Sequence, residues 1–181
     1  YDTMVEQVIE TEAPTKARRA PGATDSRPTR LRDVTADGLE RLALPVEEFS
    51  RVLGGGLVPG SVILVGGDPG IGKSTLLLEI AAMTANTHGS ALYVSGEESA
   101  RQIKMRADRL ALQSENLFLV TETRLHAIME HIQSVNPILT IVDSIQTTYD
   151  EEMNSSAGSV SQVRESASRL QEVAKQTGVV V

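Results

Sequence analysis

Apolar runs and helix-type repeats alternate along the chain from residue 61 to the last residue. The short apolar runs predict strands at residues 61–66, 91–95, 117–120 and 138–143, with a fifth beginning at residue 178. Between them, apolar residues recur every three or four positions, which predicts helices over residues 73–85, 99–111, 125–135 and 160–176. Continuous apolar strands alternating with helices are typical of an α/β fold in which helices cover both faces of a mostly parallel sheet.

Local signals place two helix ends and one long loop. Ser99 followed by Gln102 is a capping box, which favours a helix beginning at that point. Pro137 ends the helix before it, because the residue preceding a proline avoids helical backbone angles. Residues 146–159 are polar and rich in Gly and Ser, so we expect a loop there.

The first 35 residues differ in composition from the rest. Residues 10–35 contain three Pro and almost nothing apolar, so they cannot bury enough surface to offset the cost of ordering. We therefore expect residues 1–35 to be a flexible linker and residues 36–181 to form the domain. The domain holds 18 acidic and 11 basic residues, which carry the whole net charge of −7. DNA-coating proteins usually present a basic face, so any DNA contact here would come from local loops, an assembled oligomer or sequence outside this chain.

Composition excludes several classes of protein. No stretch approaches the roughly 18 apolar residues of a membrane-spanning helix, so we expect no membrane association. The chain has no Cys, which excludes disulfides and thiolate metal sites and fits a reducing compartment, and we expect the cytoplasm. Only 3% of the residues are aromatic, which argues against a nucleic-acid platform of stacked bases.

The strongest motif lies between the first predicted strand and the helix after it. Residues 67–74 match the phosphate-loop pattern G-x-x-x-x-G-K-[ST]. In such loops backbone N–H groups surround the phosphates, and the helix N-terminus adds positive potential. Lys73 would reach the β- and γ-phosphates, and Ser74 would ligate Mg²⁺. The predicted nucleotide-binding residues are Gly67, Asp68, Pro69, Gly70, Ile71, Gly72, Lys73, Ser74 and Thr75.

Two later residues extend this prediction. Asp143 ends an apolar strand, the place where a phosphate-loop enzyme carries the Asp that holds Mg²⁺. Such an Asp is otherwise a turn residue or a helix cap. Gln146 follows three residues later, and it either senses the γ-phosphate or is an ordinary loop amide.

Glu97 and Glu98 follow the second predicted strand. A carboxylate beside the phosphate loop could accept a proton from the attacking water, the general-base role in hydrolysis. Acidic residues at a helix N-terminus are also favoured by the helix dipole, which explains at least one of the pair. We predict Glu97 as the base and keep Glu98 as the alternative.

Four segments together resemble the ATPase core of the bacterial RadA (Sms) family of DNA-repair proteins, which belongs to the RecA-like ATPases. They are residues 53–60 (LGGGLVPG), 66–75 (GGDPGIGKST), 93–99 (YVSGEES) and 138–147 (ILTIVDSIQT), and residues 3–6 (TMVE) resemble the stretch after that family's zinc finger. The resemblance implies a RecA-like phosphate-loop fold that uses ATP and Mg²⁺. It also implies a hexameric ring that drives branch migration on single-stranded or branched DNA and works with the recombinase RecA.

The resemblance also indicates what this chain lacks. Zinc would belong only to a finger preceding Tyr1, and the family's KNRFG motif and protease-like domain would follow Val181. We therefore interpret the chain as a fragment with an incomplete sheet, and expect it alone to be a poor ATPase. The alternative to a DNA motor is a RecA-like ATP-binding switch or kinase. A small GTPase is weakly supported, because these residues contain no N-K-x-D motif.

Overall fold

The computed structural model of the chain describes residues 28–34 and 40–181. The chain divides into two units, residues 1–34 and residues 35–181. In the first unit, the described part contains one 3₁₀ turn, η1 (Leu31–Asp33), with no buried residue. Most of the predicted linker, residues 1–27, lies outside the described residues.

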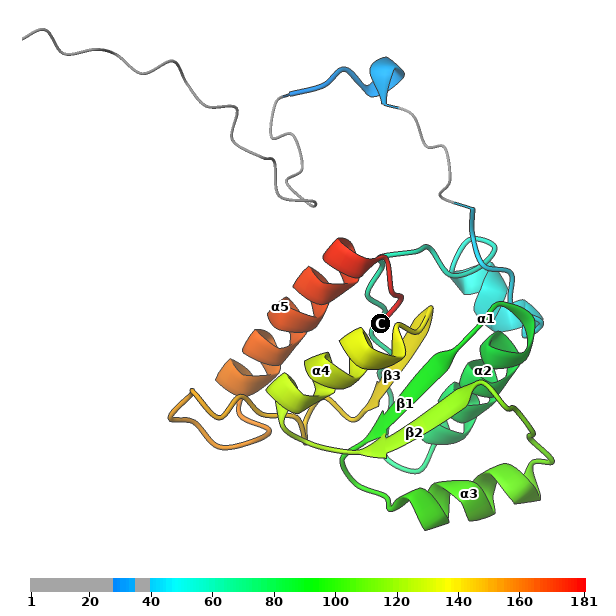
Figure 1. The fold of residues 1–181 in the computed structure, drawn as a ribbon, viewed down its shortest axis with the longest axis vertical. Coiled ribbons are helices and arrows are strands. Elements are labelled where there is room, and N and C mark those ends of the chain that lie inside the picture. Colours follow the sequence, from blue (N-terminus) through cyan, green and yellow to red (C-terminus); the bar gives the residue numbers. More distant parts are fainter. Residues whose placement is uncertain (1–27, 35–39) are drawn as a thin grey trace, which may run out of the picture. The chain divides into compact units, whose positions relative to one another are not determined.

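A three-stranded parallel sheet forms the centre of the second unit (Figure 1). Its order is β2 (Leu117–Thr121), β1 (Ala91–Ser95) and β3 (Leu139–Asp143). Ser95, at the end of β1, lies between Thr121 and Asp143 in the register of its two neighbours. The carboxyl ends of all three strands therefore meet at one edge, where parallel α/β sheets bind their ligands.

The predicted strand at residues 61–66 is wrong as a regular strand. Beyond β3, Val180 forms a single parallel bridge to Leu139. Residues 61–63 lie next to residue 181 and are hydrogen-bonded to it. There, Ile63 N–H donates to the Val181 carbonyl at 2.8 Å, and Val181 N–H donates to the Ser61 carbonyl at 3.0 Å. Residues 64–66 form no backbone hydrogen bond with other described residues and lie outside regular secondary structure, and Leu64 is 85% exposed.

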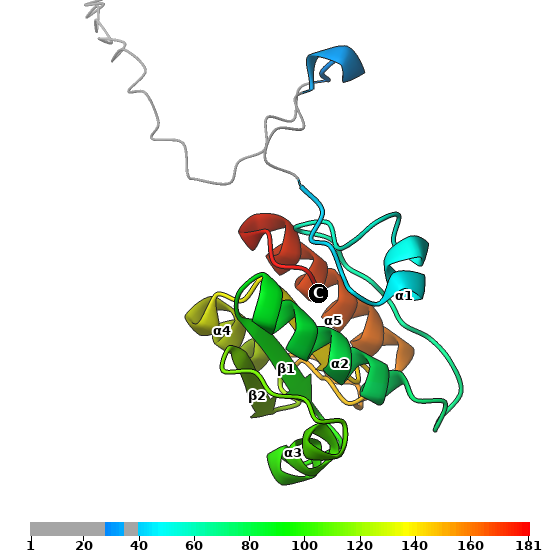
Figure 2. The same cartoon turned by 90° about the vertical axis from the view of Figure 1, so that its right-hand side faces the viewer.

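Helices cover both faces of the sheet, as the alternation of elements predicts (Figure 2). They are α1 (Glu47–Val52), α2 (Lys73–Thr87), α3 (Ala100–Arg109), α4 (Leu125–Val135) and α5 (Val160–Thr177). Ala91 and Tyr93 of β1 share one buried cluster with α2 and α3. Leu92 and Val94 point to the opposite face and pack with α4 and α5. This alternation is the two-residue period of a strand buried on both sides.

The helix ends follow the local signals. Ser99 and Gln102 form both hydrogen bonds of the predicted capping box at the start of α3. α4 ends at Val135, and its C-cap Asn136 lies in the left-handed region with φ 47°, immediately before Pro137. Within the described ranges, no helix has the length and apolar character needed to cross a bilayer.

Candidate nucleotide-binding site

The predicted phosphate loop leads directly into α2. Gly70 and Gly72 have φ values of 80° and 102°, in the left-handed region that glycine adopts without strain. A Cβ built at either position would meet no heavy atom within 4 Å, so the loop encloses open space rather than packed protein. The first backbone N–H groups of α2 have no partners within their own helix. These are the features by which phosphate-binding loops hold an anion at a helix N-terminus.

Lys73 folds back over this loop. Its ammonium donates to the carbonyl oxygens of Gly67 at 2.7 Å and Asp68 at 2.8 Å. These carbonyls hold the charge at the mouth of the loop, within reach of an anion bound there. The side chain is half-buried, so it can leave the carbonyls without disturbing the core.

Asp143 lies across from the loop, at the end of β3. The Tyr93 hydroxyl donates to its Oδ2 at 2.6 Å and lies 3.4 Å from the backbone carbonyl of Ser74. Tyr93 is fully buried, and that burial, followed by the hydrogen bond to the Asp143 carboxylate, raises the pKa of the phenol far above its ordinary value. The phenol is therefore always a donor toward Asp143.

The two glutamates at the end of β1 point in different directions. Glu97 is exposed, and its Oε1 accepts a hydrogen bond from the Ser144 hydroxyl at 2.9 Å. Glu98 forms an ion pair with Arg106 of α3, at 2.7 Å between Nη2 and Oε2. Glu97 is thus the carboxylate available to a ligand, while Glu98 is held by a cation.

One cleft of about 860 Å³ brings these groups together. Its lining includes the predicted residues Gly67, Pro69, Gly70, Lys73, Ser74, Glu97, Asp143 and Gln146. The side chain of Gln146 is exposed at its rim. Asp68, Ile71, Gly72 and Thr75 belong to the loop or to the first turn of α2 but do not line the cleft.

Known proteins provide an independent comparison. A family model described as an AAA domain matches residues 25–181. The chain is 45% identical to DNA repair protein RadA of Halalkalibacterium halodurans and 44% identical to that of Bacillus subtilis. Each alignment covers 100% of this chain and 40% of the relative.

The chain belongs to the AAA-domain family. The resemblance to the RadA ATPases is confirmed by these relatives, although the chain spans only about two fifths of their length. A solved KaiC-like protein from Pyrococcus horikoshii OT3 shares the fold, with a TM-score of 0.63 and 19% identity. That match covers 78% of this chain and 68% of the KaiC-like protein. The RecA-like α/β fold class predicted from the sequence is therefore confirmed.

Magnesium would fit this AAA domain. The predicted ligands are a hydroxyl and a carboxylate, the hard oxygen donors that Mg²⁺ prefers alongside substrate phosphates. Tyr93 contacts both Asp143 and the backbone of Ser74, so the two predicted ligands flank one buried hydroxyl. Across residues 28–34 and 40–181, no three His, Asp or Glu side chains gather into a metal site. A cation here would therefore depend on the phosphates.

Three contacts of this AAA domain are not predicted by the sequence. They are the hydrogen bond from Tyr93 to Asp143, the one from Ser144 to Glu97, and the close approach of Thr147 to Gly96. A Cβ on Gly96 would lie 2.0 Å from the Thr147 hydroxyl, so only glycine lets this turn lie against the end of β1. The position of Tyr93 does indicate that its hydroxyl has a partner, because a Tyr inside an apolar strand needs one.

A smaller acidic cavity of about 320 Å³ adjoins the ends of β1 and β2. Glu97, Glu98 and Glu122 contribute its carboxylates. The Arg124 side chain donates to Glu122, and these hydrogen bonds lower the pKa of Glu122 to about 2. Glu122 therefore stays charged at neutral pH. Arg106 and Arg124 pair with Glu98 and Glu122, so Glu97 is the carboxylate of this cavity without a cationic partner among the described residues, and its charge disfavours a phosphate here.

Proposed function

We propose that this chain is the Mg²⁺-dependent ATP-hydrolysing core of a motor that acts on DNA in recombinational repair and promotes branch migration. One observation carries the enzymatic part: Lys73, Asp143 and Glu97 come from three separate elements and line the same cleft. The names of the relatives, which are DNA repair proteins, support the biological part.

Binding is assigned to the loop and the start of α2. The backbone N–H groups of residues 67–75 surround the phosphates, and Lys73 moves from its two carbonyl partners to the β- and γ-phosphates. Ser74 and Asp143 hold the cation. Bound Mg²⁺ neutralises charge on the transferred phosphoryl group.

Catalysis is assigned to the side of the cleft formed by Glu97 and the loop after β3. Glu97 takes a proton from the attacking water through a carboxylate oxygen, and Ser144 orients that carboxylate by donating to Oε1. Gln146, exposed at the rim, contacts the γ-phosphate and reports its presence to the loop after β3. Glu97 is preferred over Glu98 as the base because Glu98 is ion-paired with Arg106.

DNA, the recombinase RecA and further copies of the chain in a hexameric ring are the proposed partners. The domain is acidic overall, so we assign DNA contact to the neutral residues 154–159 and to surfaces formed on assembly. A repair role of this kind acts on the chromosome and therefore in the cytoplasm.

The test measures ATP hydrolysis with and without single-stranded and branched DNA. It uses the 181-residue chain and a chimera in which this chain replaces the matching region of the Bacillus subtilis relative. We expect the chimera to hydrolyse ATP faster with DNA and to migrate branches. A rate of ATP hydrolysis that does not change when DNA is added would instead favour the ATP-binding switch or kinase. The absence of nucleotide binding would refute the proposal altogether.

A further inference from the structure

The Tyr93 hydroxyl is buried and contacts both walls of the cleft, at Asp143 and at the backbone of Ser74, and it has no part in the proposed function. It lies in the middle of β1, with no exposed surface. Its ring packs in the cluster formed with α2, and its hydroxyl lies between the end of β3 and the first turn of α2. A polar group at full burial is retained where it has a partner, and its short bond is to Asp143.

The register of the sheet explains this contact. Tyr93 pairs with Ile141 and Ser95 pairs with Asp143, so Tyr93 lies two residue pairs before Asp143 and on the same face of the sheet. From there its hydroxyl reaches Asp143 Oδ2 at 2.6 Å. Oδ1 accepts no hydrogen bond from any residue in the described ranges. One carboxylate oxygen is therefore fixed by a donor and the other is left for a ligand.

We propose that Tyr93 is a positioning residue of the magnesium–nucleotide site, which holds the Asp143 carboxylate in one orientation and sets its distance from the first turn of α2. This inference rests on the proposed function, because it presumes that Asp143 holds the cation. Groups that orient a metal-binding side chain from behind typically change metal affinity by about 10–100-fold when they are removed. The ring of Tyr93 should carry the packing, and only its hydroxyl should carry this effect.

The test is the substitution Tyr93→Phe in the 181-residue chain, which removes the hydroxyl and keeps the ring. Binding of the fluorescent nucleotide mant-ADP is followed while Mg²⁺ is titrated, and again in EDTA. We expect the Mg²⁺ concentration for half-maximal binding to rise about tenfold, while affinity in EDTA stays unchanged. Tyr149→Phe is the matched control, because Tyr149 contributes only backbone hydrogen bonds, and it should behave as wild type.

Asp143→Asn provides a second and independent arm. If Tyr93 acts through the carboxylate, adding Tyr93→Phe to Asp143→Asn should change the Mg²⁺ requirement no further. An unchanged requirement in the single variant would overturn the inference, and so would an equal loss of affinity with and without Mg²⁺, which indicates packing alone. Wild type that binds no mant-ADP in either condition would overturn the proposed function as well. Circular dichroism at the assay temperature checks that each variant is folded.

Discussion

On the proposed function, Lys73 would exchange its two carbonyl partners for phosphate oxygens when a nucleotide binds. Its ammonium already donates to two loop carbonyls, so the loop without phosphate is not left with a free charge. Nucleotide binding would replace these two neutral carbonyl acceptors with charged phosphate oxygens, and hydrogen bonds between charged groups are stronger. The same residue would therefore stabilise the loop without nucleotide and the phosphates with it.

We expect Lys73→Ala to leave the fold intact and to lower ATP turnover by roughly 10²–10³-fold. The side chain is not part of either buried cluster, so truncating it removes phosphate stabilisation but no core packing. Circular dichroism and steady-state hydrolysis in the chimera would show this. Lys175→Ala, at an exposed lysine near the end of α5, is the control and should keep normal turnover. Equal turnover in both variants would refute the phosphate-loop assignment.

We expect Glu97→Gln in the chimera to bind Mg-ATP normally and to hydrolyse it at least about 10²-fold more slowly. Glutamine keeps a hydrogen bond from Ser144 but cannot accept the proton of the water. Nucleotide affinity and single-turnover hydrolysis separate the two effects. Glu98→Gln, which weakens the ion pair with Arg106, is the comparison and should retain most of the rate. The reverse pattern would make Glu98 the base.

For single residues, the sequence predicts a role where the neighbouring residues in the chain indicate it. The phosphate loop is one contiguous motif, and Asp143 could be recognised from the strand before it. The partners of these residues could not be predicted in the same way. Tyr93 meets Asp143 only because the parallel register sets Ser95 against Asp143, and Ser144 meets Glu97 only through the turn after β3.

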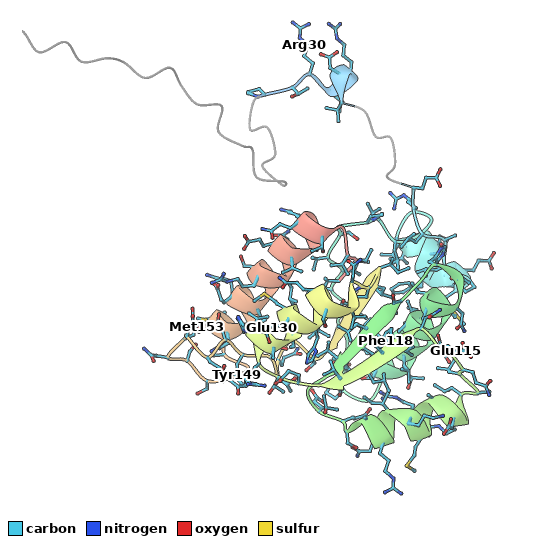
Figure 3. The ribbon with its side chains drawn as sticks, in the orientation of Figure 1. Arg30, Glu115, Phe118, Glu130, Tyr149 and Met153 are labelled. Atoms are coloured by element: carbon cyan, nitrogen blue, oxygen red, sulfur yellow. The ribbon has the colours of Figure 1, made fainter. Side chains whose placement is uncertain are left out.

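Among the elements, the loop from β3 to α5 departs most from its expected character. Its polar composition predicts a flexible segment, but part of it is held by Gln162, a fully buried residue in the first turn of α5. The side chain accepts from Asp150 N–H at 2.8 Å and donates to the carbonyls of Asp150 at 3.1 Å and Ser155 at 2.9 Å. Figure 3 shows Tyr149 and Met153 on this stretch of chain. In the sequence, a Gln in a helix with many polar residues reads as exposed, so nothing indicated this role.

We expect Gln162→Ala to destabilise the chain by about 1–3 kcal/mol, because it leaves partly buried backbone groups of Asp150 and Ser155 without their Gln162 partner. Chemical denaturation measures the change in the free energy of unfolding. Hydrogen exchange should show that the amides of residues 150–155 lose protection first. Gln176→Ala, at an exposed glutamine in the last turn of α5, should change stability by less than about 0.5 kcal/mol. Unaltered protection in Gln162→Ala would contradict the anchoring role.

The domain exposes apolar side chains at two separate places, in residues 61–66 and on β2. Residues 61–66 are hydrogen-bonded to other backbone only at Ser61 and Ile63, and within them Leu64 is 85% and Val62 41% exposed. On β2, at the other side of the sheet, Phe118 is 46% exposed (Figure 3). The sequence predicts the sheet and both helical layers, but it cannot predict how far pairing extends, because that depends on which backbone lies alongside. Unpaired edges with apolar side chains are the usual sites of self-association.

We expect the chain to self-associate and Leu64→Lys to reduce this association, since a charge on an unpaired edge opposes pairing between copies. Light scattering over a concentration series of the 181-residue chain would measure it. Val52→Lys, at a residue of α1 that is 77% exposed, is the control and should have little effect. A wild-type chain that stays monomeric, or two variants with equal effects, would show that residues 61–66 are not the contact.

The missing side chain of Gly96 also links parts of the site that the chain separates. Because Thr147 fits against Gly96, the turn carrying Gln146 is interlocked with the segment carrying Glu97, and Ser144 hydrogen-bonds the two. On the proposed roles, the sensor of the γ-phosphate and the base would shift together as one rigid piece. DNA bound at residues 154–159 would then move the base together with the sensor, and the faster hydrolysis expected with DNA would pass through this one turn.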